Sequence, residues 1–190
     1  VIPHLWDLKH QMMEEQGGIC GYCGLKIDFK TEERTVEHLI PKGVSRELVG
    51  EYKNLLLCCS LTQEENDDIT NGIITDIDVI HCDDTKGNTQ LNYTPLQENC
   101  DTHFIYDITG HIMPTDFGSA TDINTLNLDC QSLVDRRKMA MNILFDESGI
   151  MLSNDELQQI SSSIMQRQAD GMFREFCFVI KSAIDNLLNP

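Results

Sequence analysis

The sequence lacks long apolar runs, and its longest two span only residues 55–59 and 176–180. A helix that crosses a bilayer needs about 20 consecutive apolar residues, so we expect no membrane span. Residues 1–4 also lack the basic and apolar regions of a secretory signal. We therefore expect a cytoplasmic protein.

Basic residues are scarce, because 14 Lys and Arg stand against 31 Asp and Glu for a formal net charge of −17. Lys86 is the only base between Ser60 and Asp135, a stretch with 15 acidic residues. Such a charge repels nucleic acid, so a polyanion would have to approach the N-terminal part, whose charges are nearly balanced. The bases expected near a site there are Lys26, Lys30, Arg34, Lys42, Arg46, Lys53 and Lys86.

The eight cysteines could form the disulfides of a small secreted protein, but a chain of 190 residues can build a core without such crosslinks. We therefore favour reduced thiols or metal ligands. Cys20 and Cys23 form a C-x-x-C knuckle with glycines on either side, which lets the backbone wrap a metal. Further cysteines at Cys58, Cys59 and Cys82 allow a closed site of four thiolates, from Cys20, Cys23, Cys59 and Cys82. Such closed sites are structural, because no position is left for a substrate.

Hydrophobic periodicity predicts a mixed α+β protein. Apolar residues at helix spacing predict a first helix that reaches Gln16 and is ended by Gly17-Gly18. Short strands are expected at residues 35–40 and 54–57, the first of them closed by Pro41. The topology therefore begins with a helix, a cysteine knuckle and two strands.

The rest of the chain is expected to be mainly helical. The acidic stretch of residues 60–80 looks like an insertion, and a short helix is expected within residues 83–91. Residues 104–113 suggest a hairpin around Thr109-Gly110. After Ala120 apolar residues recur at helix spacing, and residues 172–187 predict a final helix that packs in the core or at an interface.

The order of the motifs is specific. Along the chain stand Cys20-Gly21-Tyr22-Cys23, Glu37-His38-Leu39-Ile40-Pro41, Asn54-Leu55 and Cys82 with Lys86-Gly87. This order resembles the HNH endonucleases. With Leu126-Asn127-Leu128 before Arg136-Arg137, the chain resembles more closely the PtuB-type HNH proteins. These are the nuclease subunits of Septu and of some retron antiphage systems.

The resemblance implies a zinc-stapled ββα-metal HNH core in residues 1–95, with the insertion at 60–80. Residues 96–190 would form a hairpin and helical extension that binds the partner. The family's five-residue step from Asn54 selects Cys59 rather than Cys58 as the third zinc ligand. Asn54 would be the residue whose amide carbonyl orients the catalytic imidazole.

The chemistry of phosphodiester hydrolysis suits the same residues, since it needs a base for water and a cation at the phosphate. His38 can be that base, because an unperturbed imidazole titrates near neutral pH. Glu37 and Asp83 can hold Mg²⁺ or Mn²⁺ through hard oxygens, provided that the strand ends at Glu37 and His38. His81 could replace Asp83 at that metal or support the zinc ligands, and Asp84 is a further alternative to Asp83. Lys86 is expected to contact phosphate.

The partners implied by the resemblance are a PtuA-like ABC-type ATPase, a nucleic acid substrate and a retron reverse transcriptase with its RNA/DNA. DNA is favoured as substrate. Structured RNA or tRNA is an alternative, because nothing in the motif reads a base or a 2′-hydroxyl. The rival hypothesis is a catalytically inactive, zinc-bearing adaptor. The run Arg136-Arg137-Lys138 is expected to be either a partner contact or a solvated helix face.

Overall fold

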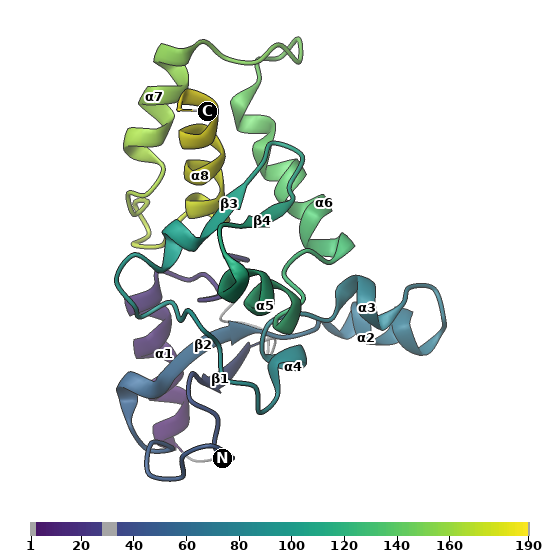
Figure 1. Cartoon of the computed structure of the whole chain (residues 1–190), viewed down its shortest axis with the longest axis vertical. Coiled ribbons are helices and arrows are strands. Elements are labelled where there is room, and N and C mark those ends of the chain that lie inside the picture. Colours follow the sequence, from purple (N-terminus) through teal and green to yellow (C-terminus); the bar gives the residue numbers. More distant parts are fainter. Residues whose placement is uncertain (1–2, 28–33, 190) are drawn as a thin grey trace.

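A computed structural model describes residues 3–27 and 34–189 and has a mixed α+β fold, as predicted (Figure 1). In chain order its elements are α1 (Pro3–Gln16), β1 (Arg34–His38), η1 (Tyr52–Asn54), β2 (Leu55–Cys59), α2 (Gln63–Thr70), α3 (Asp76–Val79), α4 (Asp83–Lys86), η2 (Cys100–His103), β3 (Phe104–Tyr106), β4 (Ile112–Pro114), α5 (Phe117–Thr125), α6 (Gln131–Ala140), η3 (Met141–Leu144), α7 (Asn154–Ser163) and α8 (Cys177–Leu188). None of the described helices has the length and apolar character that a bilayer crossing requires.

Helix α1 ends at Gln16, as predicted, because Gly17 follows with a φ of 67°, a conformation that favours glycine. The Gln16 side chain then joins this helix to β2. Its Nε2 donates to the Leu57 carbonyl at 2.9 Å, and its Oε1 accepts from the Leu57 backbone N–H at 2.7 Å. The helix is therefore fixed to the strand that leads to Cys59.

Strands β1 and β2 pair antiparallel, with Glu37 opposite Leu56 and His38 opposite Leu55. The first strand stops at His38 rather than at residue 40. The reason is the Asn54 side chain, which binds both the N–H and the carbonyl of Ile40 in place of a strand partner. The catalytic candidates Glu37 and His38 thus lie at a strand end.

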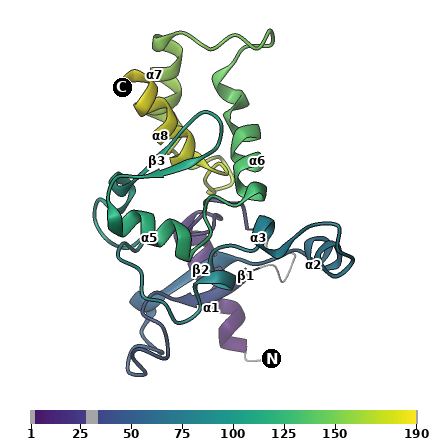
Figure 2. The same cartoon turned by 45° about the vertical axis from the view of Figure 1, so that its right-hand side comes forward.

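Residues 60–80 form an arm of two short helices, α2 and α3, which extends sideways from β1 and β2 in Figures 1 and 2. A capping box between Thr62 and Glu65 starts α2. The same Glu65 carboxylate binds Arg136 of α6 at 2.7 Å. The acidic insertion is thereby tied to the C-terminal helices.

The predicted hairpin is present as β3 and β4, with Tyr106 opposite Ile112. Asp107 shapes its turn, because its Oδ1 accepts from the backbone N–H groups of Thr109 and His111. The short helix expected within residues 83–91 is the single turn α4, which ends at Lys86.

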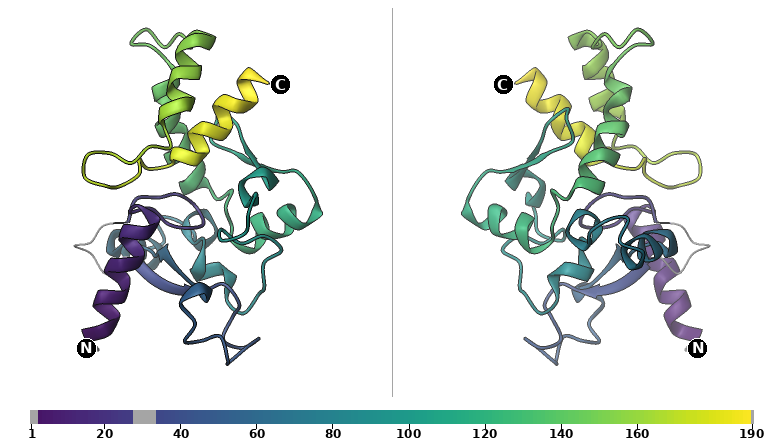
Figure 3. Two further views of the ribbon diagram at one scale, coloured as in Figure 1. Left: turned by 90° about the vertical axis from the view of Figure 1, so that its left-hand side faces the viewer. Right: turned by 90° about the vertical axis from the view of Figure 1, so that its right-hand side faces the viewer.

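The prediction that the last helix begins at Met172 is wrong, since α8 begins at Cys177. Residues 173–176 instead bind the loops around the knuckle, where the N–H of Phe173 donates to Gly17 and that of Phe176 to Gly24. Figure 3 shows this loop next to the end of α1. One hydrophobic core therefore contains side chains from both halves of the chain.

Candidate metal centre and active site

Four cysteine side chains converge in the core. Cys20 and Cys23 come from the knuckle, Cys59 from the end of β2, and Cys82 from the position before α4. Their sulfur atoms lie within 4.8 Å of one another, and all four residues are buried. Two of the Sγ–Sγ distances are 3.9 Å, from Cys20 to Cys82, and 3.6 Å, from Cys23 to Cys59. These are the cysteines predicted as ligands, and Cys58 is not among them.

The sulfur spacing fits a metal rather than disulfides. Zn–S bonds of about 2.3 Å in a tetrahedron place the sulfurs about 3.8 Å apart, whereas a disulfide joins them at about 2.05 Å. The eight cysteines are all free thiols. The cluster could therefore hold a metal ion such as zinc.

The backbone around the cluster is folded to present its sulfurs. Gly24 has a φ of 81°, and its N–H donates to the Cys20 carbonyl at 3.0 Å, which closes the knuckle. A Cβ on Gly24 would lie 2.7 Å from the ring of Phe178, so larger residues are excluded. Cys82 has a φ of 61°, a conformation that costs a non-glycine residue about 1–3 kcal/mol. The close packing at Gly24 and the unusual backbone conformation of Cys82 thus both help to position the cysteine sulfurs.

His81 lies beside the sulfurs rather than beside Glu37. Its Nδ1 is 3.2 Å from Cys82 Sγ and 3.7 Å from Cys59 Sγ. Burial lowers the pKa of His81, which favours the neutral form of its ring. Of the two roles considered for His81, this contact favours support of the thiolates, because a ring N–H can donate to a thiolate sulfur.

Arg137, a residue of α6, is fully buried, which corrects the expectation that it is solvated or contacts a partner. Its guanidinium lies over the Tyr106 ring, 5.1 Å from the centroid, and its Nε and one terminal nitrogen lack hydrogen-bond partners among the described residues. The charge is close enough to His81 to lower its pKa. A four-thiolate zinc site carries two negative charges, so a buried cation without a carboxylate partner fits a metal-loaded cluster.

A second polar cluster joins the end of β1 to α4. Thr35 Oγ1 donates to Asp83 Oδ2 at 2.8 Å, and Lys86 forms an ion pair with Glu37 and donates to the His38 carbonyl at 3.1 Å. The Lys86 side chain is fully buried, and that of Glu37 is 9% exposed. Burial, with the neighbouring Asp83 carboxylate, raises the pKa of Glu37 to about 7, although Lys86 opposes the shift. One ion pair and two hydrogen bonds thus join β1 to α4.

The expectation that Lys86 contacts phosphate is wrong, because its ammonium is enclosed and already paired. A buried ammonium needs such a partner, since the desolvation of an unpaired charge is very costly. Local residue spacing does not predict this arrangement, because Glu37 stands 49 residues before Lys86 in the chain. Lys30, another base expected near the site, lies outside the described residues.

The His38 ring is oriented by a backbone carbonyl. Its Nε2 lies 3.0 Å from the carbonyl oxygen of Val49, and the residue is 9% exposed. A carbonyl can only accept a hydrogen bond, so Nε2 carries the proton and the neutral ring keeps Nδ1 free to accept one. The contact with Val49 therefore leaves Nδ1 of His38 as the nitrogen that could accept a proton from water.

Asn54 does not make the contact predicted for it. Its Oδ1 accepts from the Ile40 N–H at 2.8 Å, and its Nδ2 donates to the carbonyls of Ile40 and Leu48 at 3.1 and 3.2 Å. The prediction that its amide carbonyl orients the imidazole is therefore wrong. Asn54 instead holds the loop of residues 39–53, from which Val49 reaches His38. A backbone contact of this kind leaves no side-chain signal in the sequence.

The structure brings the carboxylates of Glu37 and Asp83 together, and the His38 ring, one residue after Glu37 at the strand end, lies against the carbonyl of Val49. Within the described ranges, the four cysteines form the one group of three or more potential metal ligands. Two carboxylates still fit Mg²⁺ or Mn²⁺, since such ions keep several waters and also bind substrate phosphates. A cation bound there would share the Glu37 carboxylate with Lys86.

The chain was also compared with known proteins. Neither a protein-family model nor a curated protein matches it.

Proposed function

We propose that this protein is a metal-dependent HNH-type endonuclease that hydrolyses phosphodiester bonds of nucleic acid, with DNA favoured. The observation that carries the proposal is the junction of β1 and α4. There His38 ends the strand, Glu37 meets Asp83 of the helix, and Cys59 and Cys82 flank the same elements. A candidate base, two hard-oxygen ligands and a structural metal centre thus fall within one small unit of two strands and a helix.

In this proposal the four cysteines hold a structural Zn²⁺, because a closed site of four thiolates leaves no position for substrate. The metal would hold the knuckle, β2 and the start of α4 together, since the knuckle and β2 contribute ligands and Cys82 directly precedes α4. The catalytic residues lie next to this centre but are not its ligands. Loss of zinc would therefore abolish activity through the fold.

The catalytic step begins at His38. Its Nδ1 accepts a proton from a water molecule while the Val49 carbonyl holds Nε2–H, and the water oxygen forms a bond to phosphorus. The bond from phosphorus to the leaving oxygen breaks, and that oxygen takes a proton from solvent. Glu37 and Asp83 would hold Mg²⁺ or Mn²⁺, which supplies positive charge at the phosphate when bound.

The charge of the chain supports a role as one subunit of a larger assembly. At −17 the protein repels nucleic acid, and phosphate contacts by Lys and Arg provide most non-specific attraction to DNA. A basic partner would supply that attraction. The resemblance to PtuB-type proteins favours an ABC-type ATPase in antiphage defence, with a retron reverse transcriptase as a further partner.

A catalytically inactive zinc-bearing adaptor is the second candidate, and one observation favours it. Lys86 is already paired with Glu37, so an internal cation neutralises a carboxylate that a catalytic metal would need. In this case the acidic surface would only bind the partner. The DNA and structured-RNA versions of the nuclease, by contrast, share one catalytic site and differ in substrate.

Cleavage by the assembled complex separates these candidates. The complex would be incubated with end-labelled DNA and RNA pools, with and without added Mg²⁺ or Mn²⁺. A nuclease gives cleavage that depends on the added cation, and the pool that is cut identifies the substrate. Intact pools under all conditions would contradict the nuclease proposal and favour the adaptor.

A further inference from the structure

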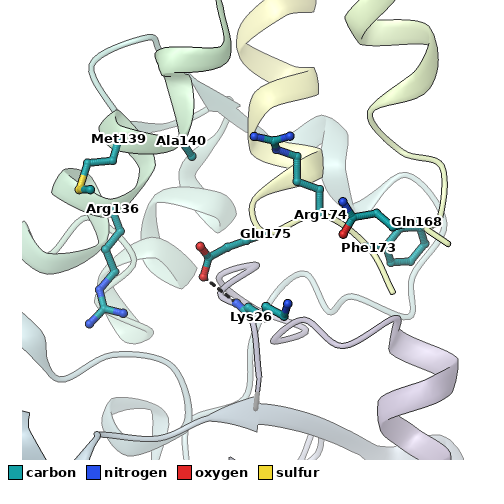
Figure 4. Close-up of a pocket in the computed structure, with 8 residues that line it drawn as sticks. All are labelled: Lys26, Arg136, Met139, Ala140, Gln168, Phe173, Arg174 and Glu175. Atoms are coloured by element: carbon teal, nitrogen blue, oxygen red, sulfur yellow. Dashed lines mark hydrogen bonds between the residues drawn. The ribbon is translucent and has the colours of Figure 1, made fainter. Parts of the chain in front are cut away.

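A pocket of about 490 Å³ lies between α6, residues 168–175 and Lys26 (Figure 4). Its volume falls within the range of about 300–1,000 Å³ that is usual for small-molecule sites. Its lining shares no residue with the cysteine cluster or with the junction of β1 and α4. It is therefore a separate candidate site.

The pocket gathers positive charge in a strongly acidic chain. Lys26, Arg136 and Arg174 line it, against the single acid Glu175. Over residues 3–27 and 34–189, no hydrogen bond or ion pair engages the Lys26 ammonium or the Arg174 guanidinium. Arg136 is held by Glu65 through one terminal nitrogen and stays 44% exposed. Two uncommitted cations and one preorganised arginine suit an anionic ligand, and arginine favours phosphate.

The acid in the pocket points to more than a bare anion. Glu175 Oε1 accepts from the Lys26 backbone N–H at 2.9 Å, which fixes the carboxylate between Arg136 and Arg174 in the view of Figure 4. A carboxylate repels phosphate but accepts hydrogen bonds from sugar hydroxyls, as acidic residues do in dinucleotide sites. Met139, which is 71% exposed, and the neighbouring Ala140 add apolar surface that suits a planar base.

We propose that this pocket binds a nucleoside phosphate. Lys26, Arg136 and Arg174 contact its phosphate groups, Glu175 accepts from its ribose hydroxyls, and its base lies against Met139 and Ala140. The ligand is either a free nucleotide or the end of a nucleic acid strand, which present the same chemistry. The site stands independently of the nuclease proposal, because none of its residues serves the proposed cleavage.

Calorimetric titration of the full-length, zinc-loaded chain tests this site with ATP, 2′,3′-dideoxyATP and inorganic phosphate. We expect ATP to bind more tightly than phosphate, and Arg174→Gln to weaken ATP binding at least tenfold, since one charge-assisted contact is lost. The matched control is Lys138→Gln, which removes an exposed charge from α6 outside the pocket and should leave affinity unchanged. Thermal unfolding of each variant checks that the fold is intact.

Glu175→Gln tests the ribose contact. In the wild-type protein ATP should bind several-fold more tightly than 2′,3′-dideoxyATP, and the variant should lose that preference. Displacement of ATP by a 5′-phosphorylated single-stranded oligonucleotide would identify the strand end as ligand, and failure of that displacement would identify the free nucleotide. The proposal is overturned if ATP does not bind, if phosphate binds as tightly as ATP, or if Lys138→Gln weakens binding as much as Arg174→Gln.

Discussion

Replacing Lys86 with methionine should make the stability of this protein more dependent on pH than that of the wild type. The substitution roughly keeps the volume of a fully buried side chain but leaves Glu37, which lies beside Asp83, without its cation. Removal of one partner from a buried ion pair typically costs about 3–5 kcal/mol. That cost requires an ionised Glu37, and burial with the Asp83 carboxylate raises the pKa of Glu37 to about 7.

The sign of the pH effect follows from the raised pKa. The folded state holds a proton on Glu37 up to about pH 7, whereas the unfolded state releases it near 4.5. This group therefore stabilises the fold fully below pH 4.5, and its contribution is lost as pH rises through 7. At pH 8 wild-type Glu37 is mostly charged, and in the variant it takes up a proton instead of remaining as an unpaired buried charge. Its pKa of about 7 lies about one unit below pH 8, so Lys86→Met should cost up to about 1.4 kcal/mol more at pH 8 than at pH 5.5. At pH 5.5 Glu37 is protonated, so the same change should cost about 1 kcal/mol or less.

Urea denaturation at pH 5.5 and pH 8, without added divalent cation, measures the difference between variant and wild type at each pH. The control is Lys181→Met, because Lys181 forms a half-exposed pair with Asp185 on α8 and should cost less than about 1 kcal/mol at both values. An equal destabilisation by Lys86→Met at the two pH values would refute the reasoning. So would a stable variant at pH 8.

Three further predictions concern the metal centre, the loop and the charge. Cys23→Ser should yield protein without zinc and with an unfolded N-terminal half, since thiolate binding free energy is also folding free energy; elemental analysis that finds zinc in a stable Cys23→Ser protein would contradict this. Asn54→Ala should reduce cleavage less than loss of the base does, because Asn54 acts on His38 only through the loop, and an equal loss would indicate direct contact. The isolated chain should bind DNA weakly at physiological salt because of its charge of −17, and nanomolar binding in an anisotropy titration would show that a basic partner is dispensable.

The sequence predicted best where a residue type and its spacing determine the structure locally. The glycine pair after Gln16 ends the first helix, and the C-x-x-C knuckle with the later cysteines predicts the four sulfurs that meet. These features depend on backbone conformations that only glycine adopts easily and on ligands that only thiolates provide. Helix ends set by distant contacts were predicted less well. The last helix starts at Cys177 because Phe176 binds Gly24, about 150 residues earlier in the chain.

The sequence named the residues of the candidate active site, which stay a prediction, but it did not indicate their contacts. The motif identified Glu37, His38 and Asp83, yet the burial of Lys86 depends on a carboxylate far away in the sequence. The partner of the His38 ring is a backbone carbonyl, which any residue at position 49 could offer. Side-chain patterns therefore predict which groups carry chemistry, while the fold decides which of them meet.

The rate of cleavage by a complex that contains His38→Ala tests the central claim most directly. His111→Ala is the matched control, because its side chain is half-exposed and pairs with Asp129 away from the proposed site. With zinc content and partner binding equal to wild type, His38→Ala should slow cation-dependent cleavage by about 10²–10⁴-fold, the usual contribution of a general base. His111→Ala should leave the rate unchanged. Near-wild-type cleavage by His38→Ala would contradict the account.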